Sequence, residues 1–203
     1  QSKIKKPKIC FIPTATGDDD AYKVNFYSTF SKLNSEPCHL DFFKRTPNIE
    51  DLISAQDIVF VGGGNTKSML AVWKDWGLVK ILKDAYDKGT IMCGVSAGAI
   101  CWFENGITDS WESELKIINC LSFVSGNCCP HYDEEPQRRP ALKKYLQNRD
   151  LDDCYAIEGG CALHLIDGEP HKCIAFKKTR NTYCVKLENN KIVEEPFFRE
   201  EIL

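Results

Sequence analysis

The chain has 203 residues, of which 43% are hydrophobic and 27% charged, with 26 Lys and Arg against 29 Asp and Glu for a formal net charge of −3. This composition excludes disordered and fibrous proteins and is typical of a globular protein large enough to bury a sizeable core. The cations are scattered and no apolar run approaches ~20 residues, so we expect no nucleic-acid partner, no membrane association and a cytoplasmic location.

The first half of the chain alternates short apolar runs, typical of buried strands, with longer runs typical of helices. This alternation predicts parallel strands joined by right-handed crossovers, and hence an α/β three-layer sandwich with a mostly parallel central sheet. In such sheets the functional residues lie at the carboxyl ends of the strands. The expected strands are 8–13, 38–43, 57–61 and 90–95, and the expected helices are 18–33, 66–76, 78–88 with Gly89 as a C-terminal cap, and 96–102.

The pattern changes after Glu104. A polar loop leads to a strand-like run at 115–124, a turn-prone stretch at 125–140 and an expected helix at 141–149. Three further apolar runs are separated by turn signals and predict antiparallel hairpins added to the sheet. No repeat or linker is visible, so we expect one domain spanning 1–203. The three C-terminal runs are 154–166, 172–177 and 182–187.

The segment Gly94-Val-Ser96-Ala-Gly98 matches Gly-x-Ser-x-Gly where a strand is expected to end and a helix to begin. Glycines at its ends remove Cβ atoms that would clash as the strand turns against the helix, and the tight apex exposes the Ser96 hydroxyl. The pattern predicts a nucleophile elbow with Ser96 as the catalytic nucleophile. The alternative interpretation is a tight strand-to-helix loop with no catalytic role.

A glycine-rich loop, Gly62-Gly63-Gly64-Asn65, follows the preceding strand. Its backbone can approach the same corner of the sheet, and we expect an N–H of Gly63 or Gly64 to form an oxyanion hole with the N–H of Ala97. Asn65 is a candidate for substrate binding. A plain turn and a phosphate-binding loop are the alternatives, but the spacing that phosphate loops require is missing.

A serine nucleophile needs a base, and the chain has four histidines. His39, His164 and His171 fall in expected strands or hairpins. His131 lies in the irregular polar segment 127–133, where a loop is able to carry it over the strand ends. We therefore expect His131 to be the base.

The base in turn needs a carboxylate to orient it and to stabilise the imidazolium. Three candidate acids lie between Ser96 and His131, and two further candidates follow His131. The residues alone do not rank these candidates. They are Asp109, Glu112, Glu114, Asp133 and Glu158.

Three segments of the chain resemble, in order and spacing, the motifs of the peptidase E family of serine peptidases, which includes aspartyl dipeptidase and the more distant cyanophycinase. They are Phe60-Val-Gly-Gly-Gly-Asn-Thr66, Gly94-Val-Ser-Ala-Gly-Ala99 and Pro130-His-Tyr132. The resemblance covers about residues 8–190. It implies a fold like that of class I glutamine amidotransferases, with Ser96 as nucleophile, His131 as base and the glycine loop contributing to the oxyanion hole.

The same resemblance places the acid a little over a dozen residues after the serine, which implies Asp109 first, with Glu112 or Glu114 as substitutes. For Glu158, within a stretch that recurs in the family, it implies a structural or substrate-facing role. The aspartyl dipeptidase branch needs a cation for the carboxylate of its substrate, and Arg138 and Arg139 are the candidates. The alternative is a solvated pair at the start of a helix.

The expected function is hydrolysis of small peptides, in the manner of a dipeptidase, through a Ser-His-acid triad and an acyl-enzyme. No cofactor is expected, and the protein is expected to be a monomer or a homodimer. Two alternatives remain open: an esterase or amidase of the serine hydrolase type, and a non-catalytic binding module on the same scaffold.

The eleven cysteines are odd in number and lie mostly in apolar runs, so we expect reduced thiols that fill the core. No Cys-x-x-Cys pair is present. Cys128-Cys129-Pro-His131 is only a weak signal for a metal, and no metal site is expected.

Overall fold

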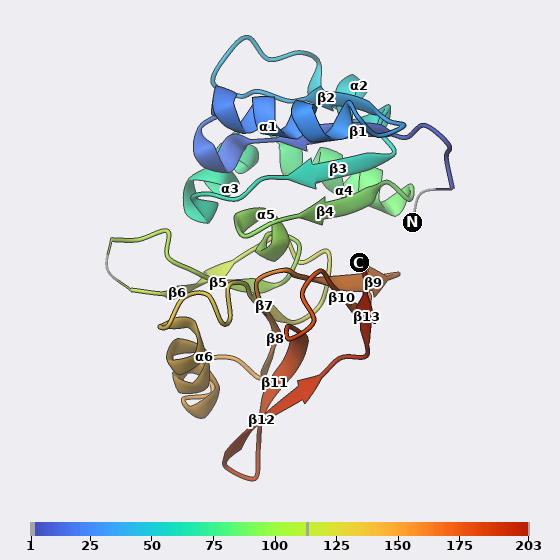
Figure 1. The fold of residues 1–203 in the computed structure, drawn as a ribbon. Helices are drawn as coiled ribbons and strands as arrows, with labels where there is room; N and C mark the ends of the chain where they lie inside the picture. Colours follow the sequence, from blue (N-terminus) through green and yellow to red (C-terminus); the bar gives the residue numbers. More distant parts are fainter. Residues whose placement is uncertain (1–2, 113, 203) are drawn as a thin grey trace. The chain divides into compact units, whose positions relative to one another are not determined.

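The computed structural model describes residues 3–112 and 114–202 (Figure 1). The chain forms two compact units, Gln1–Ala99 and Ile100–Leu203. The first has one sheet and the second has two, and each unit has a hydrophobic cluster of its own. The expected α/β class with parallel strands is confirmed, while the expectation of a single domain stays a prediction. Among the described residues, no helix is long and apolar enough to cross a membrane.

The first unit is built on a four-stranded parallel sheet in the order β2-β1-β3-β4. The order reverses between β1 and β3, so the loops that follow these two strands leave the sheet side by side at its carboxyl edge. The strands are β1 (Lys8–Ile12), β2 (Glu36–His39), β3 (Ile58–Val61) and β4 (Ile91–Gly94), and the helices are η1 (Thr14–Thr16), α1 (Asp20–Phe30), α2 (Ile49–Ser54), α3 (Thr66–Asp75), α4 (Leu78–Asp87) and α5 (Ala97–Ile100).

Helices cover both faces of this sheet, as expected from the continuous apolar runs of its strands. Phe11 of β1 stacks on Phe26 of α1, with ring centroids 4.7 Å apart. Side chains alternate between the faces of a strand, so Cys10 and Ile12 point away from α1, yet they too have no exposed surface. Figure 1 shows α1 in front of the sheet and α4 behind it. A helix layer on each face explains why these strands read as continuous apolar runs.

Three elements of the first unit differ from the expectation. The strand expected at 38–43 is β2 and ends at His39, because the Asp18 carboxylate accepts the backbone N–H groups of Phe42 and Phe43 and so takes this segment out of the sheet. The helix expected at 96–102 is the single turn α5. The short helix α2 was not predicted. Gly89 ends α4 with a φ of +95°, as expected.

Among its described residues, the second unit contains a six-stranded mixed sheet, a three-stranded sheet and one helix. The sheet order is β12-β11-β8-β7-β5-β6; its central strands β5, β7 and β8 are parallel, β6 and β11 are antiparallel to them at either side, and β12 pairs antiparallel with β11. The elements of this unit are β5 (Asn105–Thr108), β6 (Lys116–Asn119), β7 (Asn127–Cys129), α6 (Arg138–Gln147), β8 (Asp153–Ile157), β9 (Cys161–Ile166), β10 (Glu169–Ala175), β11 (Thr182–Glu188), β12 (Lys191–Pro196) and β13 (Arg199–Glu201).

The expected C-terminal antiparallel hairpins are confirmed as β9–β10 and β11–β12. The run expected at 154–166 is two strands, β8 and β9, because the turn that contains Glu158 and Gly160 interrupts it; Gly160 has a φ of +78°. The expected helix 141–149 begins three residues earlier, at Arg138. Strands β5 and β7 lie in segments that were expected to be loops.

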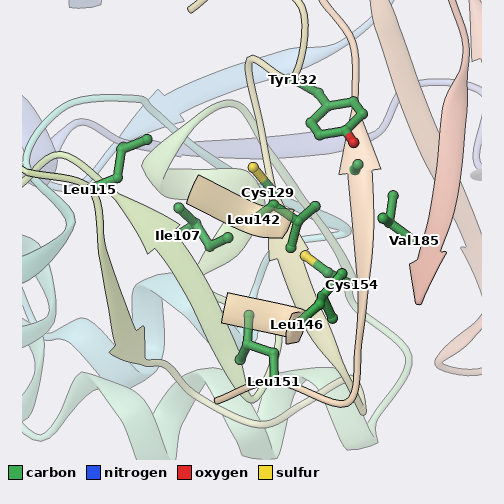
Figure 2. Packing of buried hydrophobic residues seen from close by; sticks show 10 residues of the cluster. Ile107, Leu115, Cys129, Tyr132, Leu142, Leu146, Leu151, Cys154 and Val185 are labelled. Carbon is green, nitrogen blue, oxygen red and sulfur yellow. The ribbon is translucent and has the colours of Figure 1, made fainter. Parts of the chain in front are cut away.

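The core of the second unit lies between α6 and the six-stranded sheet (Figure 2). Leu142 and Leu146 of α6 pack there with Val185 of β11 and Cys129 of β7. Tyr132, which follows β7, joins the same cluster and is 1% exposed. A large aromatic ring buried in this way anchors the chain directly after His131 to the core.

Candidate active site

The turn between β4 and α5 holds Ser96 at a φ of +55°. Such a value is uncommon for a residue with a side chain, and it persists only where the surroundings enforce it. Here the packing does so: a Cβ on Gly94 would lie 2.3 Å from the carbonyl oxygen of Gly98, and one on Gly98 would lie 2.2 Å from that of Val61. The close approach predicted for both motif glycines is confirmed, and the geometry is that of a nucleophile elbow.

The glycine loop after β3 passes directly beside this turn. A Cβ on Gly63 would lie 3.0 Å from Cβ of Ser96 and 3.6 Å from its Oγ. Gly64 has a φ of +134°, and a Cβ there would lie 2.3 Å from the carbonyl oxygen of Ala15 in the loop after β1. The two loops at the reversal of strand order therefore touch, and the backbone of the glycine loop lies directly beside Ser96.

Two polar contacts define the loop further. The N–H of Gly63 donates to the hydroxyl oxygen of Tyr22, on α1, over 3.2 Å. The Asn65 side chain accepts the N–H of Ser68 at 2.9 Å and so caps the N-terminus of α3. The expected oxyanion and substrate roles of these two residues stay predictions.

The second unit places His131 in a tight turn after β7, with a φ of +56°. Its carbonyl oxygen accepts the N–H groups of Glu134 and Glu135, each over 3.2 Å, and the neighbouring Tyr132 N–H donates to the Ile157 carbonyl over 3.0 Å. The Tyr132 hydroxyl also donates to a carboxylate oxygen of Glu194 at 2.9 Å. Backbone and side-chain bonds thus hold the histidine turn against β8 and β12.

The carboxylate in contact with the imidazole is that of Glu134, with 3.0 Å between Nδ1 of His131 and Oε2 of Glu134. The sequence analysis did not single out this residue. The signal available was the spacing of three residues after the histidine, which within a turn brings the two side chains together.

Asp109, the first choice for the acid, contacts a different group. Its carboxylate lies 3.8 Å from Nη2 of Arg138 and its side chain is 67% exposed. Glu112 and Glu114 are exposed as well.

The two remaining candidate acids pair with other groups. Asp133 accepts the Gly159 N–H at 2.7 Å and forms an ion pair with Arg180. Glu158, 6% exposed, accepts Nη2 of Arg139 at 2.9 Å and the backbone N–H of Asn181 at 3.0 Å.

The two arginines proposed for substrate binding have partners within the second unit. Arg138 is 2% exposed, and it donates from Nε to Glu135 at 2.8 Å and from Nη1 to the Ile107 carbonyl at 2.7 Å. It is therefore a buried structural cation rather than the solvated residue of the alternative interpretation.

Arg139 is held in a similar way. Its guanidinium lies 4.1 Å from the centre of the Tyr132 ring and donates to Glu158 and, at 2.7 Å, to Glu194. These two carboxylates and the face of the tyrosine ring already occupy guanidinium groups that a substrate carboxylate would need. A role for either arginine in binding substrate stays a prediction that these contacts do not support.

The eleven cysteines are free thiols, as expected. Cys128 and Cys129 have no exposed surface, and burial raises the pKa of the Cys129 thiol to about 12. A buried neutral thiol is a poor metal ligand because the thiolate is the binding form. Over residues 3–112 and 114–202, no group of three or more His, Cys, Asp or Glu is arranged to hold a metal ion.

Comparison with known proteins adds an independent line of evidence. The sequence model of peptidase family S51 matches residues 1–173. An uncharacterized peptidase of Bacillus subtilis (strain 168), YgaJ, is 43% identical over 199 residues, covering 97% of this chain and 85% of its own length. Peptidase E of Haemophilus influenzae is 25% identical over 173 residues, covering 79% of this chain and 77% of its own length. The solved structure of a peptidase from an acI-B1 Actinobacterium shares the fold, with a TM-score of 0.70 at 17% identity, over 97% of this chain and 83% of that one.

Proposed function

Because the chain belongs to peptidase family S51 and is a serine-type peptidase, we propose that it hydrolyses small peptides, as a dipeptidase does, through an acyl-enzyme on Ser96. The observation that carries this proposal is the backbone of Ser96, held at a φ of +55° between two glycines that tolerate no Cβ. A strained serine enforced by its surroundings is typical of a nucleophile elbow.

In the proposed reaction, His131 accepts the proton of the Ser96 hydroxyl as Oγ attacks the carbonyl carbon of the peptide bond. The tetrahedral intermediate collapses, the C–N bond breaks, and the imidazolium returns the proton to the departing amine. Water then attacks the ester carbon with His131 again as the base, which releases the acid product and restores Ser96.

The oxyanion of the intermediate is proposed to be bound by the N–H of Ala97 together with that of Gly63 or Gly64. The glycine loop supports this role because it lies against Ser96 with no side chain between. Use of Gly63 requires its N–H to leave the Tyr22 hydroxyl. Each such donor contributes about 10² to 10³ in kcat.

The proposal commits to small peptides and not to an acidic first residue. Arg138 and Arg139, the cations that would recognise a substrate carboxylate, are bound to carboxylates of the protein itself. The chemistry calls for no metal or organic cofactor. The oligomeric state and the cytoplasmic location stay predictions.

The test is turnover of dipeptide amides that carry Asp, Glu, Gly or Ala at the first position, compared between wild type and Ser96→Ala. Turnover should fall on the order of 10⁴ to 10⁶-fold in the variant. Ser54→Ala is a matched control, because Ser54 is exposed on α2 and donates only to its own helix.

A fluorophosphonate probe should label Ser96 in wild type and in Ser54→Ala but not in Ser96→Ala. Equal turnover in wild type and Ser96→Ala would refute the mechanism. Turnover of simple esters without any peptide cleavage would favour the esterase alternative. Absence of both labelling and turnover would favour the binding module.

A further inference from the structure

Two cysteines of the first unit face each other across neighbouring strands. Cys10 of β1 and Cys38 of β2 are direct partners in the parallel register, so their side chains leave the same face of the sheet. Neighbouring strands run about 4.7 to 4.9 Å apart, and a disulfide joins residues whose Cα atoms are about 4.4 to 6.8 Å apart. The spacing of these two residues therefore suits a disulfide, at the short end of the range.

Among the described residues, no other strand pair aligns two cysteines in this way. Cys161 of β9 and Cys173 of β10 share a face of their hairpin but are diagonal neighbours, since Cys161 lies opposite Ala175. Diagonal Cα atoms are about 7 to 8 Å apart, which is beyond the range of a disulfide. This second pair is an internal comparison, because it too combines a buried thiol with a partly exposed one.

The two thiols of the first pair differ in their access to solvent. Cys10 has no exposed surface, whereas Cys38 is partly exposed on β2, the first strand in the order of its sheet. Sγ of Cys38 donates to Oε1 of Gln56 over 3.5 Å, and Gln56 is itself fixed because its Nε2 donates to the Leu52 carbonyl at 2.8 Å. A small oxidant in solution therefore meets Cys38 first, with Cys10 buried beside it.

The acidity of the two thiols differs in the same sense as their exposure. The hydrogen bond that Cys10 donates to Cys38 lowers the pKa of Cys38, while the same contact, together with burial, raises the pKa of Cys10 well above its ordinary value. In the comparison pair, burial raises the pKa of Cys161 to about 12. Because the thiolate is the nucleophilic form of cysteine, Cys38 is the reactive member of the first pair and Cys10 is a neutral thiol next to it.

We propose that Cys10 and Cys38 form a reversible dithiol–disulfide site whose oxidant is hydrogen peroxide, with Cys38 as the attacking thiol and Cys10 as the resolving thiol. Cysteines that sense oxidants are accessible and have a resolving thiol beside them, and the strand register supplies both features here. The site uses none of the residues assigned to hydrolysis, so it stands independently of the proposed function.

The oxidation takes two steps. The Cys38 thiolate attacks one oxygen of hydrogen peroxide, the O–O bond breaks, and the departing hydroxide takes up the proton that Cys38 released, which leaves a sulfenic acid and one water. The sulfur of Cys10 then attacks the sulfenic sulfur, the S–S bond forms, the S–O bond breaks, and the Cys10 proton leaves with the hydroxide as a second water. Two electrons thus pass from the two sulfurs to one peroxide. A disulfide at this short strand spacing is strained, so exchange with a dithiol reduces it readily.

The experiment treats the full, reduced chain with hydrogen peroxide, blocks the remaining thiols with iodoacetamide and maps tryptic peptides by mass spectrometry. Cys10 and Cys38 lie in separate tryptic peptides, 9–23 and 33–44, so their disulfide joins two peptides that dithiothreitol separates again. This link should be the first to form, at least ~10-fold faster than any link between Cys161 and Cys173. A different first link, or recovery of both Cys10 and Cys38 in alkylated form, would overturn the proposal.

Three variants test the separate roles of the two thiols. In Cys10→Ala, peroxide should leave a sulfenic acid on Cys38 that dimedone traps, because no thiol remains to resolve it, and the trapping rate should rise with pH around a higher midpoint than disulfide formation in wild type. Cys38→Ala should leave the buried Cys10 unoxidised, and a dimedone adduct on Cys10 would contradict the assigned roles.

Cys161→Ala is the matched control, since it removes the partly exposed thiol of the diagonal pair. It should form the link between Cys10 and Cys38 at the wild-type rate, and loss of the link in this variant would overturn the proposal. The wild-type peptide map decides the question even where a variant fails to fold, which circular dichroism reports.

Discussion

One methyl group added at Gly98 tests how tightly the nucleophile elbow is packed. The new Cβ would lie 2.2 Å from the carbonyl oxygen of Val61, 2.6 Å from its carbonyl carbon and 2.8 Å from its Cβ. The first two belong to the backbone of a central strand and cannot rotate away. The φ of Gly98 is not in the left-handed region, so the penalty in Gly98→Ala is steric alone.

The magnitude follows from the displacement that the clash requires. Ordinary contact begins near 3.4 Å, so β3 and the turn must separate by more than 1 Å. Overpacking of this kind costs about 1 to 3 kcal/mol. The Val61 carbonyl also accepts the N–H of Val95 at 3.1 Å, and weakening that bond adds about 1 kcal/mol. Together these terms predict that the free energy of unfolding falls by about 2 to 4 kcal/mol.

The assay is urea unfolding followed by circular dichroism, combined with the rate at which a fluorophosphonate labels Ser96. Gly89→Ala is the control, since a Cβ there meets nothing within 4 Å and its φ of +95° carries only a backbone cost of roughly 1 to 2 kcal/mol. Labelling should slow strongly in Gly98→Ala and stay unchanged in Gly89→Ala. An unfolding midpoint and labelling rate equal to those of wild type in Gly98→Ala would show that the described packing of the elbow is wrong.

Two further predictions concern the second unit. Arg138→Met should lower the free energy of unfolding, measured in urea, by about 1 to 3 kcal/mol, because it leaves the buried Ile107 carbonyl without the hydrogen bond from the guanidinium. A raised KM with unchanged stability would instead support a substrate-binding role. Burial raises the pKa of Cys129 to about 12, whereas a thiol in the unfolded chain ionises near pH 8.5. The unfolded chain therefore releases a proton that the folded chain keeps, and stability should fall from about pH 8.5 towards pH 12 by up to ~1.4 kcal/mol per pH unit for this thiol. Urea unfolding of Cys129→Ala between pH 8 and pH 10 should show a shallower fall, and the same slope as wild type would contradict the assignment.

Local patterns were sufficient for most of the strands and helices of the first unit and for the tight glycine turn that holds Ser96. Strands β1, β3 and β4 and helices α3 and α4 lie within one or two residues of their expected bounds, because apolar periodicity and glycine caps act over a few neighbours. The strand expected at 38–43 is misplaced because Asp18, some twenty residues earlier in the chain, captures two of its N–H groups. The residues next to this strand in the sequence give no sign of the contact with Asp18.

The sequence by itself determined the class of fold and the tight glycine turn around Ser96, since apolar periodicity and glycine spacing are properties of short segments; His131 as the base stays a prediction. Only the tertiary structure decided which carboxylate meets the imidazole and what the arginines do. Glu134 contacts His131 because the turn at His131 has a positive φ and Gly159, in another strand connection, leaves room. Arg138 is tolerated in the interior because the Ile107 carbonyl, 31 positions away, accepts a hydrogen bond from its Nη1. Such contacts join groups distant in the chain, and their geometry exists only once the strands between them have paired.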